Sequence, residues 1–415
     1  MKFRLGILLI LLIYLTSCSS IKNFNFGKVE IGAWGPIEIR SETSAGQLFF
    51  SPLGSPEVKI NVDVIQKDMQ FLVYPVEALM AGEIYQLMSE GKLKPVVKKI
   101  KIRETCIAYL YKTEESSALW KYCPDEESFR ITKPDESIED FAISPTGELI
   151  FYTIKNDLDG NEIWQVRPDG SGSKMVFDCS DSKCSDLDLD LLTSKLVFKQ
   201  QSHAQQIGLL DLQTGIFTGF EGSGSEVSLS PDGQFLSYLE DGSDLLTIIN
   251  FASTEKIVAQ SEVGLVGEWA RDSRSILFGE LEFWGGIPGV IVSELKVPSG
   301  EIKPILYDPN QELEFYQPRF THDEGIYLAS VRLGSTGASG QFWLLSEGAK
   351  VIKQITTDPL FHYSFPSWNP DFSELVFQRF PINKSDGQPQ VVIWNQDSDT
   401  FQVIAENASR PVWLP

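Results

Sequence analysis

The chain has 415 residues, of which 42% are hydrophobic, and it carries a formal net charge of −22 at pH 7. This acidic balance argues against nucleic acid or anionic lipid headgroups as partners, because phosphate binding requires a basic patch. The charge indicates either a surface that stays soluble in a crowded setting or one that attracts divalent cations or a cationic ligand.

The chain begins with a predicted signal peptide over residues 1–17. Lys2 and Arg4 precede an apolar run that is too short to span a bilayer. Residues 15–18 then read Leu-Thr-Ser-Cys, which resembles the bacterial lipobox. The resemblance implies cleavage before Cys18 and attachment of a lipid to its thiol, and several acyl chains would hold the protein stably on a membrane. We therefore expect an extracytoplasmic protein of the bacterial cell envelope that contacts the membrane through this anchor only.

Four cysteines remain after Cys18, and an even number in an exported chain favours disulfides over free thiols. Three pairings are possible. The spacing favours Cys106 with Cys123 on adjacent strands, and Cys179 with Cys184 closing a small loop. A zinc site is not expected, because the chain has no Cys-x-x-Cys motif.

After a tether over residues 18–26, residues 27–95 predict a small antiparallel β-sandwich. Its short alternating strands are expected at residues 29–31, 36–39, 48–50, 58–62, 71–74 and 84–87. The run Gly-Pro-Ile-Glu-Ile-Arg-Ser-Glu at 35–42 resembles the opening strand of a bacterial Ig-like domain, although Thr43 replaces the proline of that family.

Residues 96–415 contain a repeat with a period of roughly 40 to 50 residues, in which an apolar run, a polar turn and a second apolar run recur. Such a period with four strands per repeat is typical of an all-β propeller. Seven blades are favoured, and six or eight are possible. The first runs of the repeats are residues 141–147, 187–193, 227–233, 267–273, 318–324, 366–371 and 410–415.

The last repeat is divided between the two ends of this region. Residues 104–111, 118–122 and 128–132 predict three strands without an innermost strand, whereas residues 410–415 predict an innermost strand without a blade after it. A ring of blades stays open unless such fragments combine. We therefore expect residues 410–415 to pair with the segment that contains Cys106.

Two turns link the first and second strands with Ser-Pro-Thr-Gly at 144–147 and Ser-Pro-Asp-Gly at 230–233. Predicted third strands carry a tryptophan in four repeats, at Trp120, Trp164, Trp343 and Trp394. Their regular spacing favours packing between blades over sugar stacking. These features resemble the TolB-like, WD-type repeat family. The resemblance implies a propeller that binds proteins or small ligands at one end of its funnel.

The usual catalytic motifs are absent from this sequence. It has three histidines, of which His203 and His362 fall in predicted loops and His322 in a predicted turn. No Gly-x-Ser-x-Gly motif occurs, so a serine hydrolase of the kind fused to some propellers is not expected. Catalytic residues are not assigned.

Two acidic segments are the remaining candidates for chemistry. Asp157 and Asp159 alternate ahead of a strand and form either a weak Ca²⁺ site or a solvated hairpin tip. Asp186, Asp188 and Asp190 alternate with leucines on a predicted innermost strand, which places all three carboxylates on one side. If that side faces the central channel, the like charges need a cation or a Lys or Arg partner.

The sequence favours a monomeric, non-enzymatic lipoprotein whose propeller binds an envelope protein or glycan without a cofactor. The alternative is a carbohydrate-active or peptide-processing propeller enzyme, because two suitably spaced carboxylates suffice for glycoside hydrolysis. A third possibility is an envelope spacer with no specific ligand.

Overall fold

The structure is a computed structural model in which the regular elements of the described residues are all β-strands. The described residues are 29–40, 47–55, 57–67, 70–90, 97–113, 116–156, 160–190, 194–201, 206–261, 263, 266–284, 286–310, 312–333, 339–382 and 387–415. The predicted signal peptide, Cys18 and the tether lie outside them, as do Asp157, Asp159 and His203. Within these ranges, no helix is long and apolar enough to cross a membrane.

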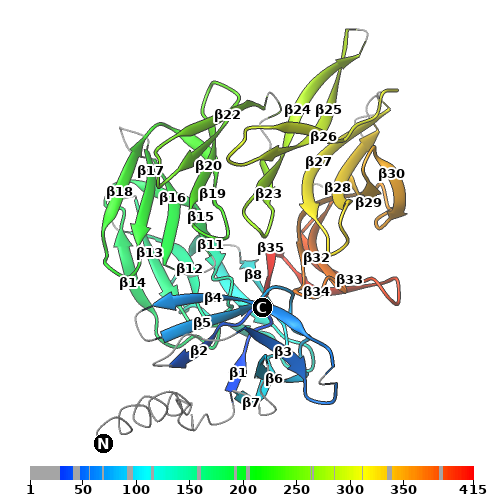
Figure 1. Cartoon of the computed structure of the whole chain (residues 1–415). Coiled ribbons are helices and arrows are strands. Elements are labelled where there is room, and N and C mark those ends of the chain that lie inside the picture. The colour runs from blue at the N-terminus through cyan, green and yellow to red at the C-terminus, as the bar shows by residue number, and fades with distance from the viewer. Residues whose placement is uncertain are drawn as a thin grey trace, which may run out of the picture. The chain divides into compact units, whose positions relative to one another are not determined.

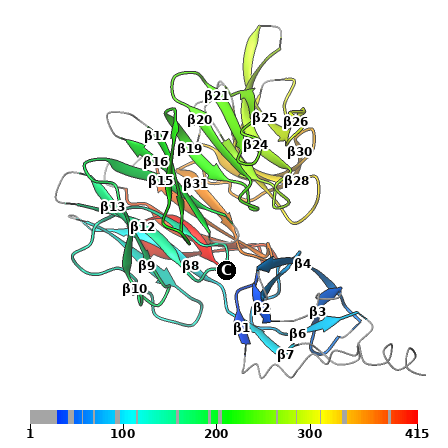
Figure 2. The ribbon, with the colours of Figure 1, turned by 60° about the vertical axis from the view of Figure 1, so that its left-hand side comes forward.

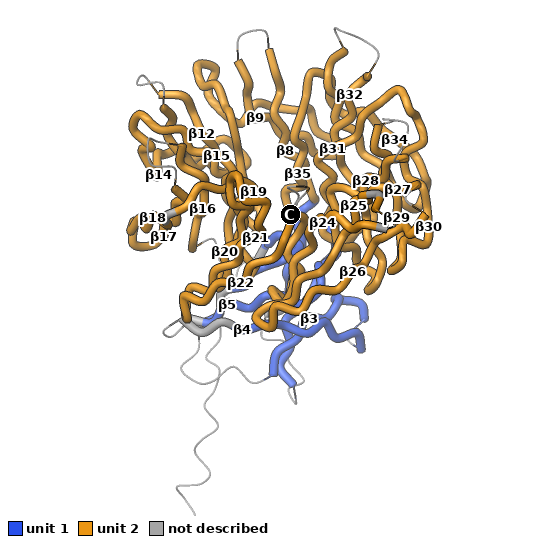
Figure 3. The backbone as a smooth tube through the Cα atoms, turned by 90° about the horizontal axis from the view of Figure 1, so that it is seen from above, with its two compact units in different colours: residues 1–104 blue, residues 105–415 orange. Residues whose placement is uncertain are grey.

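The chain divides into two units, residues 1–104 and 105–415, which are described separately (Figure 3). The strands of the first unit are hydrogen-bonded in the order β1-β7-β6-β3-β4-β5-β2. They are antiparallel except for β1 and β7. Its core contains the fully buried Phe50, Val73, Leu87 and Ile100. The strands are β1 (Val29–Ile31), β2 (Ile37–Arg40), β3 (Leu48–Pro52), β4 (Ile60–Lys67), β5 (Gln70–Pro75), β6 (Ile84–Ser89) and β7 (Val97–Ile102).

The six strands predicted for the first unit each correspond to an observed strand. The predicted boundary after residue 95 is wrong, because β7 pairs with β1 and β6 and the first unit continues to Glu104. Ile100 and Ile102 of β7 are buried in this unit. The sequence of an apolar strand does not show which strand it pairs with, so the boundary could not be predicted from it. The Ig-like assignment stays a prediction.

The second unit contains seven four-stranded antiparallel sheets among its described residues (Figure 1, Figure 2). Six sheets are consecutive in the chain: β11 (Ile138–Ile143), β12 (Ile150–Lys155), β13 (Asn161–Val166), β14 (Lys174–Asp178); β15 (Lys183–Leu189), β16 (Lys195–Gln201), β17 (Gln206–Asp211), β18 (Phe217–Glu221); β19 (Gly224–Leu229), β20 (Phe235–Glu240), β21 (Leu245–Asn250), β22 (Lys256–Gln260); β23 (Val266–Trp269), β24 (Ser275–Trp284), β25 (Ile287–Lys296), β26 (Ile302–Leu306); β27 (Leu313–Phe320), β28 (Ile326–Leu333), β29 (Gln341–Ser346), β30 (Lys350–Gln354); β31 (Phe361–Trp368), β32 (Glu374–Pro381), β33 (Gln390–Asn395), β34 (Thr400–Glu406).

The seventh sheet is built from both ends of the unit. It combines β8 (Cys106–Lys112), β9 (Ser117–Tyr122) and β10 (Phe129–Arg130) with the last strand, β35 (Ala408–Leu414). β35 runs antiparallel to β8, with Val412 opposite Ala108 and Leu414 opposite Cys106. The predicted pairing of the C-terminal segment with the Cys106 strand is therefore confirmed.

The edge strands β11, β15, β19, β23, β27, β31 and β35 are called the axial strands here. Each lies at one edge of its sheet, and those labelled in Figure 1 lie toward the middle of the seven sheets. Axial strands of neighbouring sheets contact each other, as β15 does with both β11 and β19. Side chains on these strands can therefore contact residues of a neighbouring sheet.

The second strand of each sheet is buried on both faces. In β16, Leu196, Val197 and Phe198 are all fully buried. Leu196 and Phe198 pack in the same cluster as Phe151 of the preceding sheet, whereas Val197 packs with Val227 of the following sheet. Because neighbouring side chains of a strand point to opposite faces, each sheet needs an uninterrupted apolar run here.

The predicted tryptophans lie on third strands, as expected. Trp120, Trp164, Trp343 and Trp394 belong to β9, β13, β29 and β33. Trp394 is fully buried, and its ring centre lies 6.2 Å from that of Trp368 on an axial strand. Trp394 also packs in one cluster with Leu328 and Phe342 of the preceding sheet, which supports the prediction that these rings pack between blades.

Candidate functional site

A bulge recurs at the same place in all seven axial strands. Each has a register shift against its second strand. In five of them a non-glycine residue adopts the left-handed conformation there: Asp186 (φ 54°), Glu226 (φ 54°), Gln317 (φ 49°), Phe365 (φ 53°) and Arg410 (φ 52°). This conformation is uncommon for such residues, and bulges redirect side chains near functional sites. The repeated bulge therefore sets which side chains the sheets present to one another.

Charges at the bulges influence one another across the ring. The Arg410 charge on β35 acts on both Asp186 of β15 and Glu226 of β19, although these strands lie two and three sheets away along the ring. Arg319 of β27 also acts on Glu226. Side chains so distant along the ring can interact in this way only if they face its axis.

Asp186 and Glu226 are the acidic groups of this axial cluster. Burial raises the pKa of Asp186, and the charge of Asp140 raises it further. Surrounding protein raises the pKa of Glu226 in the same way, although solvent still reaches the side chain, and the Asp186 charge adds to the effect. Both carboxyl groups are therefore easier to protonate than free side chains.

Asp140 links three axial strands. It is 3% exposed, and its Oδ2 accepts a hydrogen bond from Leu187 N of the next sheet at 3.1 Å. Its Oδ1 lies 2.5 Å from Nη2 of Arg410 on the closing strand β35. Sequence analysis missed this residue, because its partners lie 47 residues downstream and at the other end of the unit.

The three predicted channel acids have neighbours in the next sheet. Asp188 Oδ2 accepts hydrogen bonds from Ser228 Oγ at 2.7 Å and from Leu229 N at 2.8 Å. Asp186 accepts one from Glu226 N. The expectation that all three acids gather in the channel is therefore wrong, because Asp188 and Asp190 bind donors of the following sheet and of their own turn, whereas Asp186 belongs to the axial cluster.

Asp190 closes the turn that follows β15. It is 1% exposed and accepts hydrogen bonds from Ser194 N at 2.8 Å, Ser194 Oγ at 2.7 Å and Lys195 N at 3.0 Å. The crowding of the three carboxylates is thus relieved mainly by backbone and hydroxyl donors. Among the described residues, no group of three or more His, Cys, Asp or Glu side chains is arranged to hold a metal ion.

The same type of contact joins two later sheets. Glu268 Oε2 accepts a hydrogen bond from Phe320 N at 3.0 Å. Surrounding protein raises the pKa of Glu268 although solvent still reaches the side chain, and the charge of Arg319 opposes this increase. Carboxylates at the bulges therefore hold neighbouring axial strands together through backbone N–H groups.

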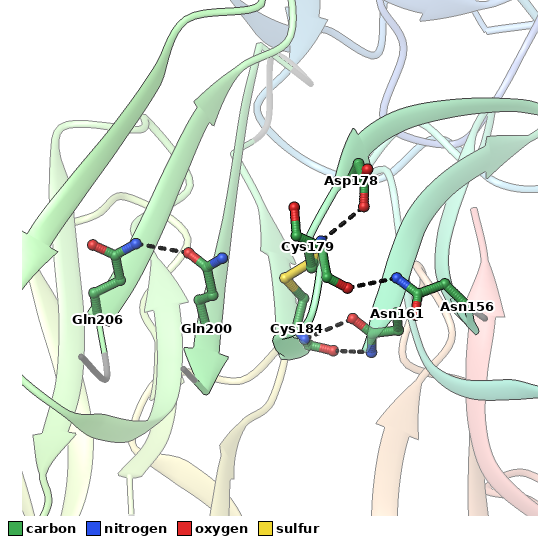
Figure 4. The surroundings of a disulfide bond; sticks show 8 residues. Asn156, Asn161, Asp178, Cys179, Cys184, Gln200 and Gln206 are labelled. Carbon is green, nitrogen blue, oxygen red and sulfur yellow. Dashed lines mark hydrogen bonds between the residues drawn. A yellow bond between two sulfur atoms is a disulfide. The ribbon is translucent and has the colours of Figure 1, made fainter. Parts of the chain in front are cut away.

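Both predicted disulfides are confirmed. Cys106 of β8 is bonded to Cys123, which follows β9. Cys179, which follows β14, is bonded to Cys184 of β15. Figure 4 shows the amide of Asn161 beside this second bond, donating to Cys184 O at 2.8 Å and accepting from Cys184 N at 2.7 Å. The bond and the amide together fix the path from one sheet to the next.

A second cluster, called the arginine sector here, consists of Tyr316, Arg332, Phe361, His362 and Arg379. The Arg332 guanidinium carbon lies 4.6 Å from the ring centre of Tyr316, and that of Arg379 lies 4.4 Å from the ring centre of Phe361. Burial lowers the pKa of His362, and the nearby charge of Arg332 lowers it further. Arg332 of β28 and His362 of β31 thus lie near each other on neighbouring sheets.

The predicted loop position of His362 is wrong, since it lies in β31 opposite Phe380. A single histidine among aromatic residues does not indicate a strand by its sequence pattern, so the position of His362 became clear only from the strand register. His322 follows β27, as the predicted turn requires, and its ring centre lies 5.9 Å from that of Phe372.

The chain matches no family model and no curated protein sequence. Its structure is similar to that of TolB from Acinetobacter baumannii, with a TM-score of 0.47, 12% identity and coverage of 86% of this chain and 82% of that chain. It is also similar to a structure from a study of two prolyl endopeptidases, with a TM-score of 0.53, 11% identity and coverage of 87% of this chain and 50% of that one.

A third similar structure is an oligogalacturonate lyase in complex with manganese, with a TM-score of 0.35, 13% identity and coverage of 72% and 73%. At these identities the comparisons concern the fold and not the activity. Together with the sheet topology, the prolyl endopeptidase match shows that this chain is an all-β protein of the β-propeller type.

Proposed function

We propose that the chain is a lipid-anchored, extracytoplasmic protein of the bacterial envelope whose propeller binds an envelope protein or glycan without catalysing a reaction. The two disulfides support an oxidising compartment. The lipobox-like Leu-Thr-Ser-Cys at 15–18 supports the anchor.

The bulges carry the binding part of this proposal. They present partly exposed side chains such as Phe365, which is 47% exposed on an axial strand although its ring centre lies 6.0 Å from the guanidinium carbon of Arg410. An exposed aromatic side chain held on a closed ring is a typical anchor for a binding partner. We therefore assign binding to the end of the ring that presents the bulges.

Site-specific crosslinking in cells tests this assignment. The photoreactive residue p-benzoylphenylalanine would replace Phe365 in one variant and Val351, 54% exposed on the outer strand β30, in the control. We expect a defined crosslinked partner from position 365 and none from position 351. Equal crosslinking from both positions, or none from either, would contradict binding at the bulges.

The contact of Asp186 with the backbone N–H of Glu226 favours one second candidate, a carbohydrate-active or peptide-processing enzyme. Two carboxyl groups with raised pKa values near one axis can share acid and base roles. Turnover of peptidoglycan fragments or peptides by the wild type, lost in both Asp186→Asn and Glu226→Gln, would support the enzyme. Binding without turnover by all three proteins would exclude it for those substrates.

A further inference from the structure

We infer that the arginine sector binds an acidic segment of a protein partner through peptide carboxylates flanked by apolar side chains. This inference rests on the proposed binding function and assigns its ligand chemistry. The sector lies at the ends of β27–β28 and β31–β32, which belong to neighbouring sheets (Figure 3).

The first argument is the charge of the sector. Neither Arg332 nor Arg379 forms an ion pair with any residue that the structure describes, even though the chain has 57 acidic residues against 35 Lys and Arg. Guanidinium groups bind carboxylates through two parallel hydrogen bonds. In so acidic a chain, two arginines without an ion pair in neighbouring sheets favour an external anion.

The carboxylates next to the sector already have other donors. Glu314 stands opposite Arg332 in the strand pair, yet its Oε2 accepts the Tyr316 hydroxyl at 2.9 Å. Asp358 Oδ1 accepts a hydrogen bond from Leu360 N at 2.9 Å. Both guanidinium groups stack on their rings, and Arg379 Nε also donates to Gln390 Oε1 at 2.7 Å, so their orientation is fixed before a ligand arrives.

The second argument is the apolar surface around the sector. Leu360, Phe380 and Ile382 are 54%, 40% and 48% exposed. Phe380 stands opposite His362, and Ile382 N donates to Leu360 O at 2.9 Å, so these side chains come from the same end of β31 and β32. Exposed apolar residues beside arginines are typical of the centre of a protein interface.

This combination favours a peptide over an acidic sugar. The ring faces of Tyr316 and Phe361 that stack against guanidinium groups are covered and cannot stack on a sugar at the same time. Exposed leucine and isoleucine side chains match apolar residues of a peptide, which a polyuronate lacks.

Selection from a random peptide library on the immobilised full chain tests the inference. We expect selected peptides to be rich in Asp or Glu next to Phe, Leu or Ile. The double variant Arg332→Gln with Arg379→Gln should bind them at least about tenfold more weakly, equivalent to about 1.4 kcal/mol. The control Arg274→Gln removes an exposed arginine from another sheet and should bind them as the wild type does. Unchanged melting temperatures would show that both variants fold.

The histidine signals give an independent measurement, because the chain has only three histidines. A bound carboxylate would offset the Arg332 charge and raise the pKa of His362 in an NMR titration, while His203 and His322 serve as internal references. Comparing one selected peptide with a free C-terminus and with an amidated C-terminus would show whether its terminal carboxylate or its side-chain carboxylates bind the sector.

Three results would overturn the inference. The first is a set of selected peptides without acidic residues. The second is a double variant that binds the selected peptides as tightly as the wild type does. The third is a His362 signal that shifts with trigalacturonate but not with the peptides. Crosslinking from position 365 would still succeed in each case, so these results would leave the proposed binding function intact.

Discussion

Asp140 shows how one side chain can hold several sheets. Its carboxylate meets Leu187 N of the next sheet and the guanidinium group of Arg410 on the closing strand. Removing Asp140 leaves the buried Leu187 N–H without its acceptor and the partly exposed Arg410 without its counter-charge, which typically destabilises a protein more than a surface substitution does.

We expect Asp140→Ala to lower the free energy of unfolding by roughly 1–3 kcal/mol, measured by urea denaturation. Asp140→Asn should cost less, because its amide oxygen can still accept the Leu187 N–H. Glu139→Ala, which alters the exposed neighbour, is the control and should change stability little. Equal, small effects for all three variants would show that Asp140 does not hold the strands together.

Asp188 gives a prediction about pH. Burial raises its pKa despite the hydrogen bonds from Ser228 and Leu229, so the native state retains a proton that the unfolded state has released. Between the ordinary aspartate value of about 3.9 and the raised value, the native state therefore binds more protons, and its stability falls as pH rises through this interval.

We expect Asp188→Asn to flatten this dependence and to leave stability at pH 7 unchanged or higher, because the amide needs no proton. Asp211→Asn is the control with the opposite sign, since hydrogen bonds from Thr214 lower the pKa of Asp211. Urea unfolding at several pH values checks both. A pH profile of Asp188→Asn identical to that of the wild type would contradict the assignment.

At the level of single elements, β35 decides whether the ring is closed. It supplies the axial strand of the seventh sheet, and its Trp413 and Leu414 are each 4% exposed. Burying two such side chains contributes roughly 3–6 kcal/mol. Without β35, the edge of β8 is also left unpaired, and an unpaired strand edge promotes aggregation.

We expect truncation after residue 407 to lower the melting temperature strongly and to produce aggregates in size-exclusion chromatography. A peptide of residues 408–415, added in trans, should restore part of the lost stability because it can pair with β8. If the truncated chain melted like the full chain, the closing role of β35 would be wrong.

Much of this architecture follows from local patterns. The apolar second strands, the third-strand tryptophans and the divided last repeat are predictable, because each sheet must bury both faces and the ring must close. The bulges are not predictable in this way. Asp186, Phe365 and Arg410 share a left-handed backbone but no residue type, so their position depends on contacts between sheets.

The candidate site was less predictable than the fold for the same reason. Alternation predicted that Asp186, Asp188 and Asp190 share a side, but it could not indicate the bulge at Asp186 or the contact of Asp188 with the next sheet. The arginine sector has no sequence motif, because Arg332 and His362 meet only when two repeats are packed together.

For the whole molecule, two features support the same compartment. Both disulfides lie in the second unit and would persist outside the cytosol. The formal charge of −22 disfavours adsorption to anionic lipid, so attachment to a membrane would depend on the proposed lipid on Cys18.

We expect Cys18→Ser to move the protein from the membrane fraction to the soluble fraction, because the serine hydroxyl cannot replace the thiol in lipid attachment. Mass spectrometry of the wild-type N-terminus should show a diacylglycerol on Cys18, and metabolic labelling with a fatty acid should be lost in the variant. Cys179→Ser, which breaks a disulfide but leaves the N-terminal segment intact, is the control and should still be labelled. A variant at position 18 that stayed in the membrane fraction would show that the chain is attached by some other contact, and the lipoprotein proposal would fail while the propeller fold and its binding end would stand.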